Sequence, residues 1–85
     1  KVVLFHHPSY SSGEHGNSAW MQWPWHTWGA HLALSGHDHS YERIVRSAGT
    51  CANFPYVING LGGASIRAFR TTIVPGSMVR YNAAN

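Results

Sequence analysis

Two histidines, His37 and His39, are separated by one residue and follow Gly36 in the stretch SGHDHSYER. In extended backbone, residues i and i+2 project to the same side, so both imidazoles can face one point. Imidazole is the commonest metal ligand of proteins, and Gly36 leaves room for an ion or a phosphate to approach the main chain. A solvated turn with two incidental histidines has the same pattern, so the spacing alone leaves both interpretations open.

A third histidine, His6, directly follows the apolar run VVLF. The C-terminal ends of strands are where α/β sheets place their sites, and the run HLALS leads to the first pair of histidines in the same way. If the two runs form parallel neighbouring strands, His6, His37 and His39 converge at one sheet edge. His7, the next residue, is interpreted as an exposed side chain without a role.

Three neutral imidazoles can hold a zinc ion and leave one position open for water. A hard cation that binds phosphate would need carboxylates in addition. The chain has only three acidic residues, Glu14, Asp38 and Glu42, and none stands where a ligand is expected. We therefore expect the metal site to be incomplete within these 85 residues.

Another candidate, His15, lies in the glycine-flanked loop SSGEHGN. A loop histidine can act as an acid on a bound substrate, although most are exposed residues without a function. Four tryptophans between positions 20 and 28 could form a carbohydrate platform. Their clustering around Pro24 favours packing instead, with one or two at the rim of a pocket. The NGLGG stretch lacks the lysine of a phosphate-binding loop and is interpreted as a tight turn.

Local patterns predict the elements that must position these residues. Pro24 begins a short helix that ends at Gly29, after a long loop over residues 6–20. The order β-loop-α-β-β-β-β is typical of one half of a layered α/β domain, and residues 75–85 are interpreted as a tail. Apolar and β-branched runs predict strands over residues 2–5, 30–35, 41–47, 55–60 and 65–74.

Composition narrows the class of protein. Charged residues make up 11% of the chain, about half the usual share, which argues against disorder and fits the interior of something larger. The net charge is +3, from scattered basic residues without a Lys/Arg run, so no nucleic-acid partner is expected. No apolar run approaches the roughly 20 residues that span a bilayer, so no membrane partner is expected.

The motifs together resemble a known family. In order along nearly the whole chain, VVLFHHPSYSSGEHG, QWPWHTWGAHLALSGHDHSYER, YVINGLGG and VRYNA are similar to the calcineurin-like metallophosphoesterases, purple-acid-phosphatase-like branch. GHxH followed by YER, with an upstream His-x-Pro-x-Tyr, is a specific combination. The resemblance implies an α/β fold, a β-sandwich flanked by helices (α/β/β/α). Residues 1–85 would be an incomplete part of it, the C-terminal half of the catalytic domain.

The resemblance also implies a dinuclear metal centre, with iron paired with zinc, manganese or a second iron. His6 and His37 would bind one metal ion and His39 the other. His15 would face the substrate phosphate or protonate the leaving group. The Asp-x-His, Gly-Asp-x-x-Tyr and Gly-Asn-His motifs of the family are absent, so the other ligands are expected from the rest of the catalytic domain. His31 stands where the family has an acidic residue.

The resulting hypothesis is hydrolysis of phosphate monoesters, of the acid phosphatase type, by a longer enzyme that is secreted or extracytoplasmic. Its expected partners are the phosphate ester and the rest of the catalytic domain, and the isolated chain is expected to be inactive. One alternative is a phosphodiesterase or nucleotidase with the same metal core. Another is a non-catalytic fragment that binds metal through its histidines or carbohydrate through its tryptophans.

Overall fold

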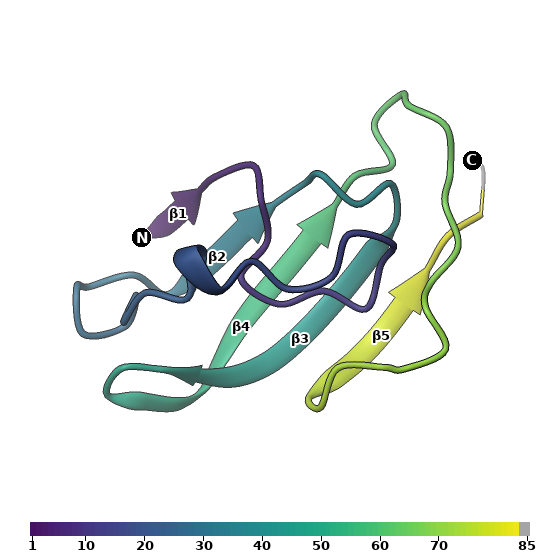
Figure 1. The fold of residues 1–85 in the computed structure, drawn as a ribbon. Coiled ribbons are helices and arrows are strands. Elements are labelled where there is room, and N and C mark those ends of the chain that lie inside the picture. Colours follow the sequence, from purple (N-terminus) through teal and green to yellow (C-terminus); the bar gives the residue numbers. More distant parts are fainter. Residues whose placement is uncertain (84–85) are drawn as a thin grey trace.

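The computed structural model describes residues 1–83, which form one five-stranded sheet with the strand order β1-β2-β4-β3-β5 (Figure 1). A single short 3-10 helix, η1 (Ala19–Met21), lies among these residues, and no helix in them is long and apolar enough to span a bilayer. The strands are β1 (Val2–Leu4), β2 (Leu32–Ser35), β3 (Tyr41–Ala48), β4 (Cys51–Asn59) and β5 (Ser77–Tyr81).

Strands β1, β2 and β4 are mutually parallel, whereas β3 runs antiparallel between β4 and β5 (Figure 1). The prediction that the runs before His6 and before His37 are parallel neighbours is confirmed, since Val2 pairs with Leu32. Parallel strands end at the same edge of a sheet. The two histidines therefore leave the sheet at one edge.

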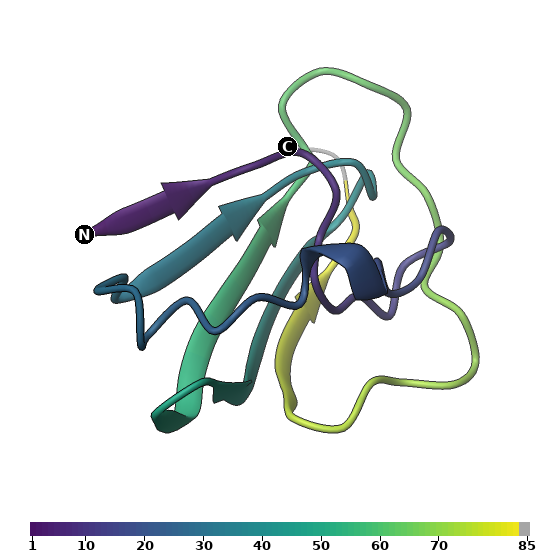
Figure 2. The ribbon, with the colours of Figure 1, turned by 60° about the vertical axis from the view of Figure 1, so that its left-hand side comes forward.

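One face of the sheet carries the hydrophobic core. Alternate residues of the strands point to this face, among them Ile44, Phe54 and Ile58, each at most 1% exposed. The chain between β1 and β2 crosses the same face (Figure 2), where Trp25 packs against the core and its ring stacks on Phe5 at 5.1 Å. The loop that carries the candidate site is thus fixed to the sheet by apolar packing.

The opposite face of the sheet has no covering layer within residues 1–83. The strand register places Leu4, Leu34, Val57, Arg43 and Val79 in one row across this face, which is apolar except for Arg43 of β3. Leu4 is 74% exposed and Val79 is 43% exposed. An apolar sheet face needs a second layer to exclude water, so this sheet has the character of one half of a sandwich.

The short helix predicted over residues 24–29 is wrong. Residues 25–29 form turns, and only the Trp28 N–H donates to the Pro24 carbonyl in the helical manner, at 3.2 Å. The His26 N–H donates instead to the carbonyl of Ala48 at 3.0 Å. The His26 N–H would have no partner within a helix that begins at Pro24, so this bond does not oppose one. The segment ends after a single turn because Gly29 has a φ of 95° and the Ala30 N–H returns to the Trp25 carbonyl at 3.0 Å.

The strand predicted over residues 65–74 is also wrong, and the fifth strand is β5, in the segment interpreted as a tail. The Arg67 N–H donates to the His39 carbonyl at 3.1 Å, and the Arg70 N–H donates to the Ser12 carbonyl at 2.8 Å. Val74 N–H donates to the Ser12 hydroxyl at 2.8 Å. The segment therefore binds to two loops of the candidate site rather than to a strand.

Candidate active site

His6 and His37 meet just beyond the ends of β1 and β2. Their rings are 5.1 Å apart, and His6 Nε2 lies 3.2 Å from His37 Nδ1. The backbone pairing of the two strands continues past their ends, since the Gly36 N–H donates to the His6 carbonyl at 3.0 Å. Gly36 lies beside this imidazole, since a Cβ at this position would be in ordinary van der Waals contact with His6 Nδ1, at 4.0 Å.

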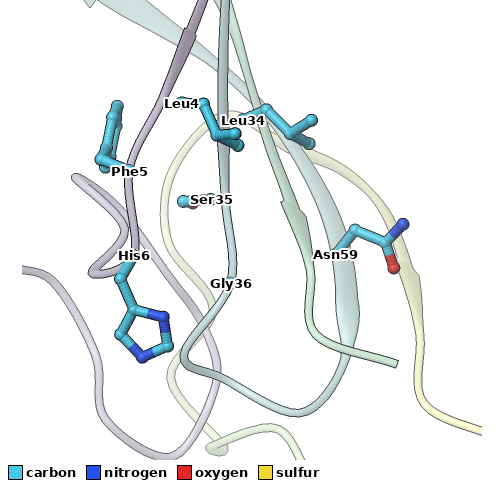
Figure 3. A pocket seen from close by; sticks show the side chains of 7 residues that line it. All are labelled: Leu4, Phe5, His6, Leu34, Ser35, Gly36 and Asn59. Carbon is cyan, nitrogen blue, oxygen red and sulfur yellow. The ribbon is translucent and has the colours of Figure 1, made fainter. Parts of the chain in front are cut away.

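An open pocket of about 530 Å³ lies at this edge of the sheet. Figure 3 shows its lining, with His6 beyond the end of β1, Gly36 beyond the end of β2 and Asn59 at the end of β4. The pocket is formed at the C-terminal ends of parallel strands, the position at which α/β sheets bind ligands.

His37 holds an unusual backbone conformation. Its φ is 67°, the only positive φ of a non-glycine residue within residues 1–83. Such a residue costs about 1–3 kcal/mol and persists only where its surroundings enforce it, which is common at functional sites. Here successive turns enforce it, since the Asp38 N–H donates to Gly36 at 2.8 Å and the Ser40 N–H to Asp38 at 2.9 Å.

Two further imidazoles contact His37. The ring of His15 is 4.0 Å from that of His37, and the ring of His7 is 4.2 Å from it. Burial, followed by the charges that His15 and His7 can carry, lowers the pKa of the His37 imidazole. A lowered pKa keeps His37 neutral over a wider pH range, and the neutral ring is the form that binds metal.

His7 was interpreted as an exposed residue, but the structure brings it into the cluster. In a straight strand, neighbouring side chains point to opposite faces, so His6 and His7 would diverge. The chain bends directly after β1, at residues 6 and 7, and the two rings come to 5.0 Å. The only signal in the sequence is Pro8, which ends the strand but does not give the direction of the bend.

Asp38 fixes the loop that carries His15. Its carboxylate is 1% exposed and accepts hydrogen bonds from the His15 N–H at 2.9 Å and from the Ser11 hydroxyl. Gly13 packs directly on it, since a Cβ at this position would lie 2.5 Å from the carboxyl carbon of Asp38. Sequence analysis gave Asp38 no role as a ligand and did not find this one, because the spacing HDH contains no information about a loop that is distant in the chain.

Glu42 is a second buried carboxylate on the same side of the sheet, also 1% exposed. It accepts the Ser12 N–H at 2.7 Å and the Ser77 hydroxyl at 2.5 Å. Glu42 thereby joins the His15 loop to β5. Both buried carboxylates, Asp38 and Glu42, accept hydrogen bonds from serine hydroxyls and backbone N–H groups.

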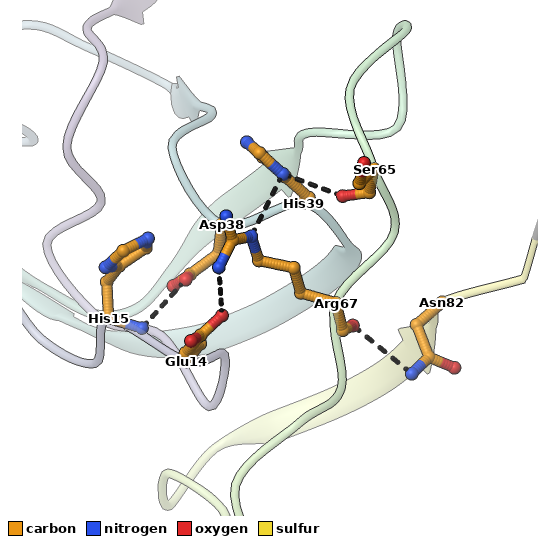
Figure 4. A network of polar contacts seen from close by, with 7 residues as sticks. All are labelled: Glu14, His15, Asp38, His39, Ser65, Arg67 and Asn82. Atoms are coloured by element: carbon orange, nitrogen blue, oxygen red, sulfur yellow. Dashed lines mark hydrogen bonds and ion pairs between the residues drawn. The ribbon is translucent and has the colours of Figure 1, made fainter.

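His39 makes no ring contact with another imidazole within residues 1–83, and its ring hydrogen-bonds to Ser65 and Arg67 instead (Figure 4). His39 Nδ1 is 2.7 Å from the Ser65 carbonyl and 3.3 Å from Arg67 Nε. One nitrogen cannot both donate to a carbonyl and accept from a guanidinium. The shorter contact places the proton on Nδ1, which leaves the Nε2 lone pair of His39 free to bind a ligand.

Arg67 contacts His39 but pairs with Glu14, whose carboxylate lies 2.7 Å from the guanidinium (Figure 4). The hydrogen bond and the charge of Arg67 hold the pKa of the Glu14 carboxyl below its usual value. Glu14 precedes His15, so this exposed pair ties the segment 65–74 to the loop of the candidate acid. All three acidic residues of the chain thus have partners within the protein.

The residues present fit part of a metal site. Within residues 1–83, no group of three or more His, Cys, Asp or Glu side chains is arranged to hold a metal ion. Two nitrogens bound at 2.0–2.1 Å to one tetrahedral cation lie roughly 3.3 Å apart, close to the separation of His6 Nε2 and His37 Nδ1. This pair suits one cation, whose remaining ligands would have to come from outside the described residues.

Comparisons with known proteins identify the fold of the chain. No model of a protein family matches the chain, and no curated protein matches it. Two solved structures cover almost all of it, each at 21% sequence identity. One is GAP50, the anchor in the inner membrane complex of Plasmodium, with a TM-score of 0.78 over 95% of this chain and 25% of that protein. The other is the purple acid phosphatase PPD1 from yellow lupin (Lupinus luteus) seeds, with a TM-score of 0.77 over 98% of this chain and 19% of that enzyme.

The chain has part of the purple-acid-phosphatase fold. The predicted fold class, an incomplete α/β metallophosphoesterase-like sandwich, is confirmed. The chain spans a quarter of one neighbour and about a fifth of the other. At this identity the likeness shows the fold alone, so the roles of His6, His15, His37 and His39 stay predictions.

Proposed function

We propose that the chain supplies the histidine-bearing edge of a metal-dependent phosphomonoesterase of the acid phosphatase type, within a longer protein. The fold does not choose this function, because one structural neighbour is titled an anchor and the other a phosphatase. The observation that carries the proposal is the histidine cluster: His6 and His37 have nitrogens 3.2 Å apart, and the His15 ring lies 4.0 Å from His37.

In this proposal His6 and His37 would hold one metal ion, and Nε2 of His39 would hold a second. The metals are iron together with zinc, manganese or iron, and the rest of the catalytic domain supplies the remaining ligands. Such cations lower the pKa of a bound water and neutralise charge on the phosphate, which supplies several kcal/mol of transition-state stabilisation. The chain's own part is to hold neutral imidazoles at fixed positions.

His15 is the proposed acid. In the hydrolysis, a water oxygen forms a new bond to phosphorus while the bond from phosphorus to the ester oxygen breaks. His15 gives its proton to the departing oxygen, so that the products are an alcohol and inorganic phosphate. The exposed ring of His15 stands over His37, and Asp38 fixes its backbone, which keeps the proton donor on the side where the phosphate would bind.

The proposal is tested in the longer protein that contains this chain by replacing His37 with Ala and measuring bound metal and hydrolysis of a phosphate monoester. We expect loss of one metal ion and a fall in kcat/KM of about 100-fold or more, since several kcal/mol depend on it. His26→Ala is the control, because the His26 side chain is exposed and, within residues 1–83, its ring hydrogen-bonds to Thr50, away from the histidine cluster. Unchanged metal content and activity in His37→Ala would contradict the proposal.

The same experiment separates the alternatives. Faster hydrolysis of a diester than of a monoester by the unmodified protein would favour a phosphodiesterase. Stoichiometric zinc without hydrolysis of either ester would favour a non-catalytic metal-binding protein. A secreted or extracytoplasmic location stays a prediction from the family resemblance.

A further inference from the structure

Trp20 is an exposed aromatic residue at the edge of the histidine cluster. Its side chain is 63% exposed, although tryptophan is usually among the more buried residues. Its ring lies 5.2 Å from that of His7, which in turn lies 4.2 Å from His37. The His7 ring therefore lies between the Trp20 indole and the candidate phosphate site, and contacts both.

The backbone that carries Trp20 is firmly held. The Ser18 N–H donates to the Pro8 carbonyl at 3.1 Å, and the Ser9 hydroxyl donates to the Met21 carbonyl at 2.6 Å. The Gln22 side chain returns a hydrogen bond to the Ser9 carbonyl at 3.0 Å. Helix η1 is thus fixed on both sides of Trp20 to the two residues that follow His7. A preorganised binding site requires an exposed aromatic ring on a backbone that is held rigidly, and Trp20 meets both conditions.

The other exposed tryptophans have different surroundings. Trp23 and Trp28 pack on each other at 5.5 Å, and Trp28 contacts Trp25 at 5.8 Å. Trp28 lines a pocket beside Lys1 and Val2 at the N-terminal end of β1, away from the ends at which the histidines gather. Within residues 1–83, Trp20 is the exposed tryptophan that contacts a ring of the histidine cluster.

We propose that Trp20 and His7 form a subsite for an aromatic leaving group of the phosphate ester. This inference rests on the proposed function and names its substrate class. With the phosphate at His6 and His37, the alcohol portion of the ester extends over His7 toward the indole. An aromatic ring there packs against Trp20 with favourable edge or offset geometry, which a saturated ring of the same size lacks.

The test compares 2-phenylethyl phosphate with 2-cyclohexylethyl phosphate, whose leaving alcohols are similarly basic and similar in size. The measured quantity is the ratio of their kcat/KM values in the longer protein that contains this chain. We expect a ratio of about two to ten in favour of the phenyl ester. In Trp20→Leu, which keeps apolar bulk, the ratio is expected to fall to about one. Trp20→Phe should restore most of it, and Trp23→Leu should leave it at the unmodified value.

Each outcome decides the inference. A ratio that is the same in the unmodified protein and in Trp20→Leu overturns the subsite while leaving the phosphatase intact, and it would mean that another part of the protein covers Trp20. Equal loss of the ratio in Trp23→Leu also overturns it, since that variant does not touch the cluster. Hydrolysis of neither ester overturns the proposed function, and the subsite with it.

Discussion

At the scale of single residues, the candidate site depends on a buried carboxylate whose hydrogen bonds hold a neighbouring loop in place. Asp38 lies between the two histidines of the HDH motif, yet its hydrogen bonds reach Ser11 and the backbone of His15. It therefore connects the turn that presents His37 to the loop that presents the proposed acid. A spacing motif indicates candidate ligands but not the residue that aligns them.

Asp38→Asn tests this positioning role. The variant keeps the shape of the side chain but replaces one acceptor oxygen by an N–H donor, which would face the Ser11 hydroxyl or the His15 N–H. We expect kcat to fall by about 10- to 100-fold with KM and metal content little changed, because His15 is displaced while the metal ligands remain. Asn53→Ala, at an exposed position of β4 outside the site loops, is the control. Loss of metal together with activity would instead show that Asp38 acts on the ligands.

At the scale of elements, sequence reasoning was most successful where the signal is local. The strands before His6 and His37, and their parallel pairing, could be predicted from apolar runs and a long connection, and this placed two site histidines at one edge. The fifth strand was predicted in the wrong segment, because β-branched composition does not show which acceptors the backbone N–H groups will bind. The Arg70 N–H binds the Ser12 carbonyl, whereas β5, with fewer signals, pairs with β3.

The candidate site was only partly predictable for the same reason. The strand pattern predicted that His6, His37 and His39 would converge, but it is His15, from the loop between the paired strands, that joins His6 and His37. The His39 ring hydrogen-bonds to the Ser65 carbonyl instead, and a residue 26 positions away leaves no mark in the HDH spacing. His7 joined the cluster through a bend of the backbone that no local pattern describes.

A prediction at this scale concerns Tyr56 of β4, which anchors the core under the site loop. Its hydroxyl donates to the Ser47 carbonyl at 2.9 Å, and burial raises its pKa to about 12. Because the folded pKa exceeds the ordinary value near 10, Tyr56 contributes stability that is complete below pH 10 and lost as pH rises toward 12. Tyr56→Phe should be less stable by about 1 kcal/mol at neutral pH and should lose less stability between pH 10 and 12. Denaturant unfolding at several pH values checks this, and parallel alkaline profiles would contradict it.

At the scale of the whole molecule, the sheet presents one covered face and one bare apolar face. Loops 6–28 and 69–75 lie over the core side, whereas Val2, Leu4 and Tyr81 remain exposed on the other, within residues 1–83. In a two-layer fold this face would meet a second sheet. In the proposed function, the rest of the catalytic domain would supply both that sheet and the further metal ligands.

Leu4→Asp tests whether the bare face is covered in the longer protein. Leu4 is 74% exposed here, so the change would be nearly neutral if the face met water. We expect instead a loss of about 2–5 kcal/mol in unfolding free energy, because a charge would be buried in an apolar interface. Ala52→Asp, an exposed position of β4, is the control. Equal stability of the two variants would mean that no second layer covers this face.

The central claim is that His6 and His37 bind the same cation, and the most direct measurement is a crystal structure of the longer protein grown with metal, with anomalous scattering to locate the ion. The claim predicts an anomalous peak about 2.0–2.2 Å from both His6 Nε2 and His37 Nδ1. A fully metal-loaded protein in which the ion lies elsewhere, with both rings facing solvent, would contradict it.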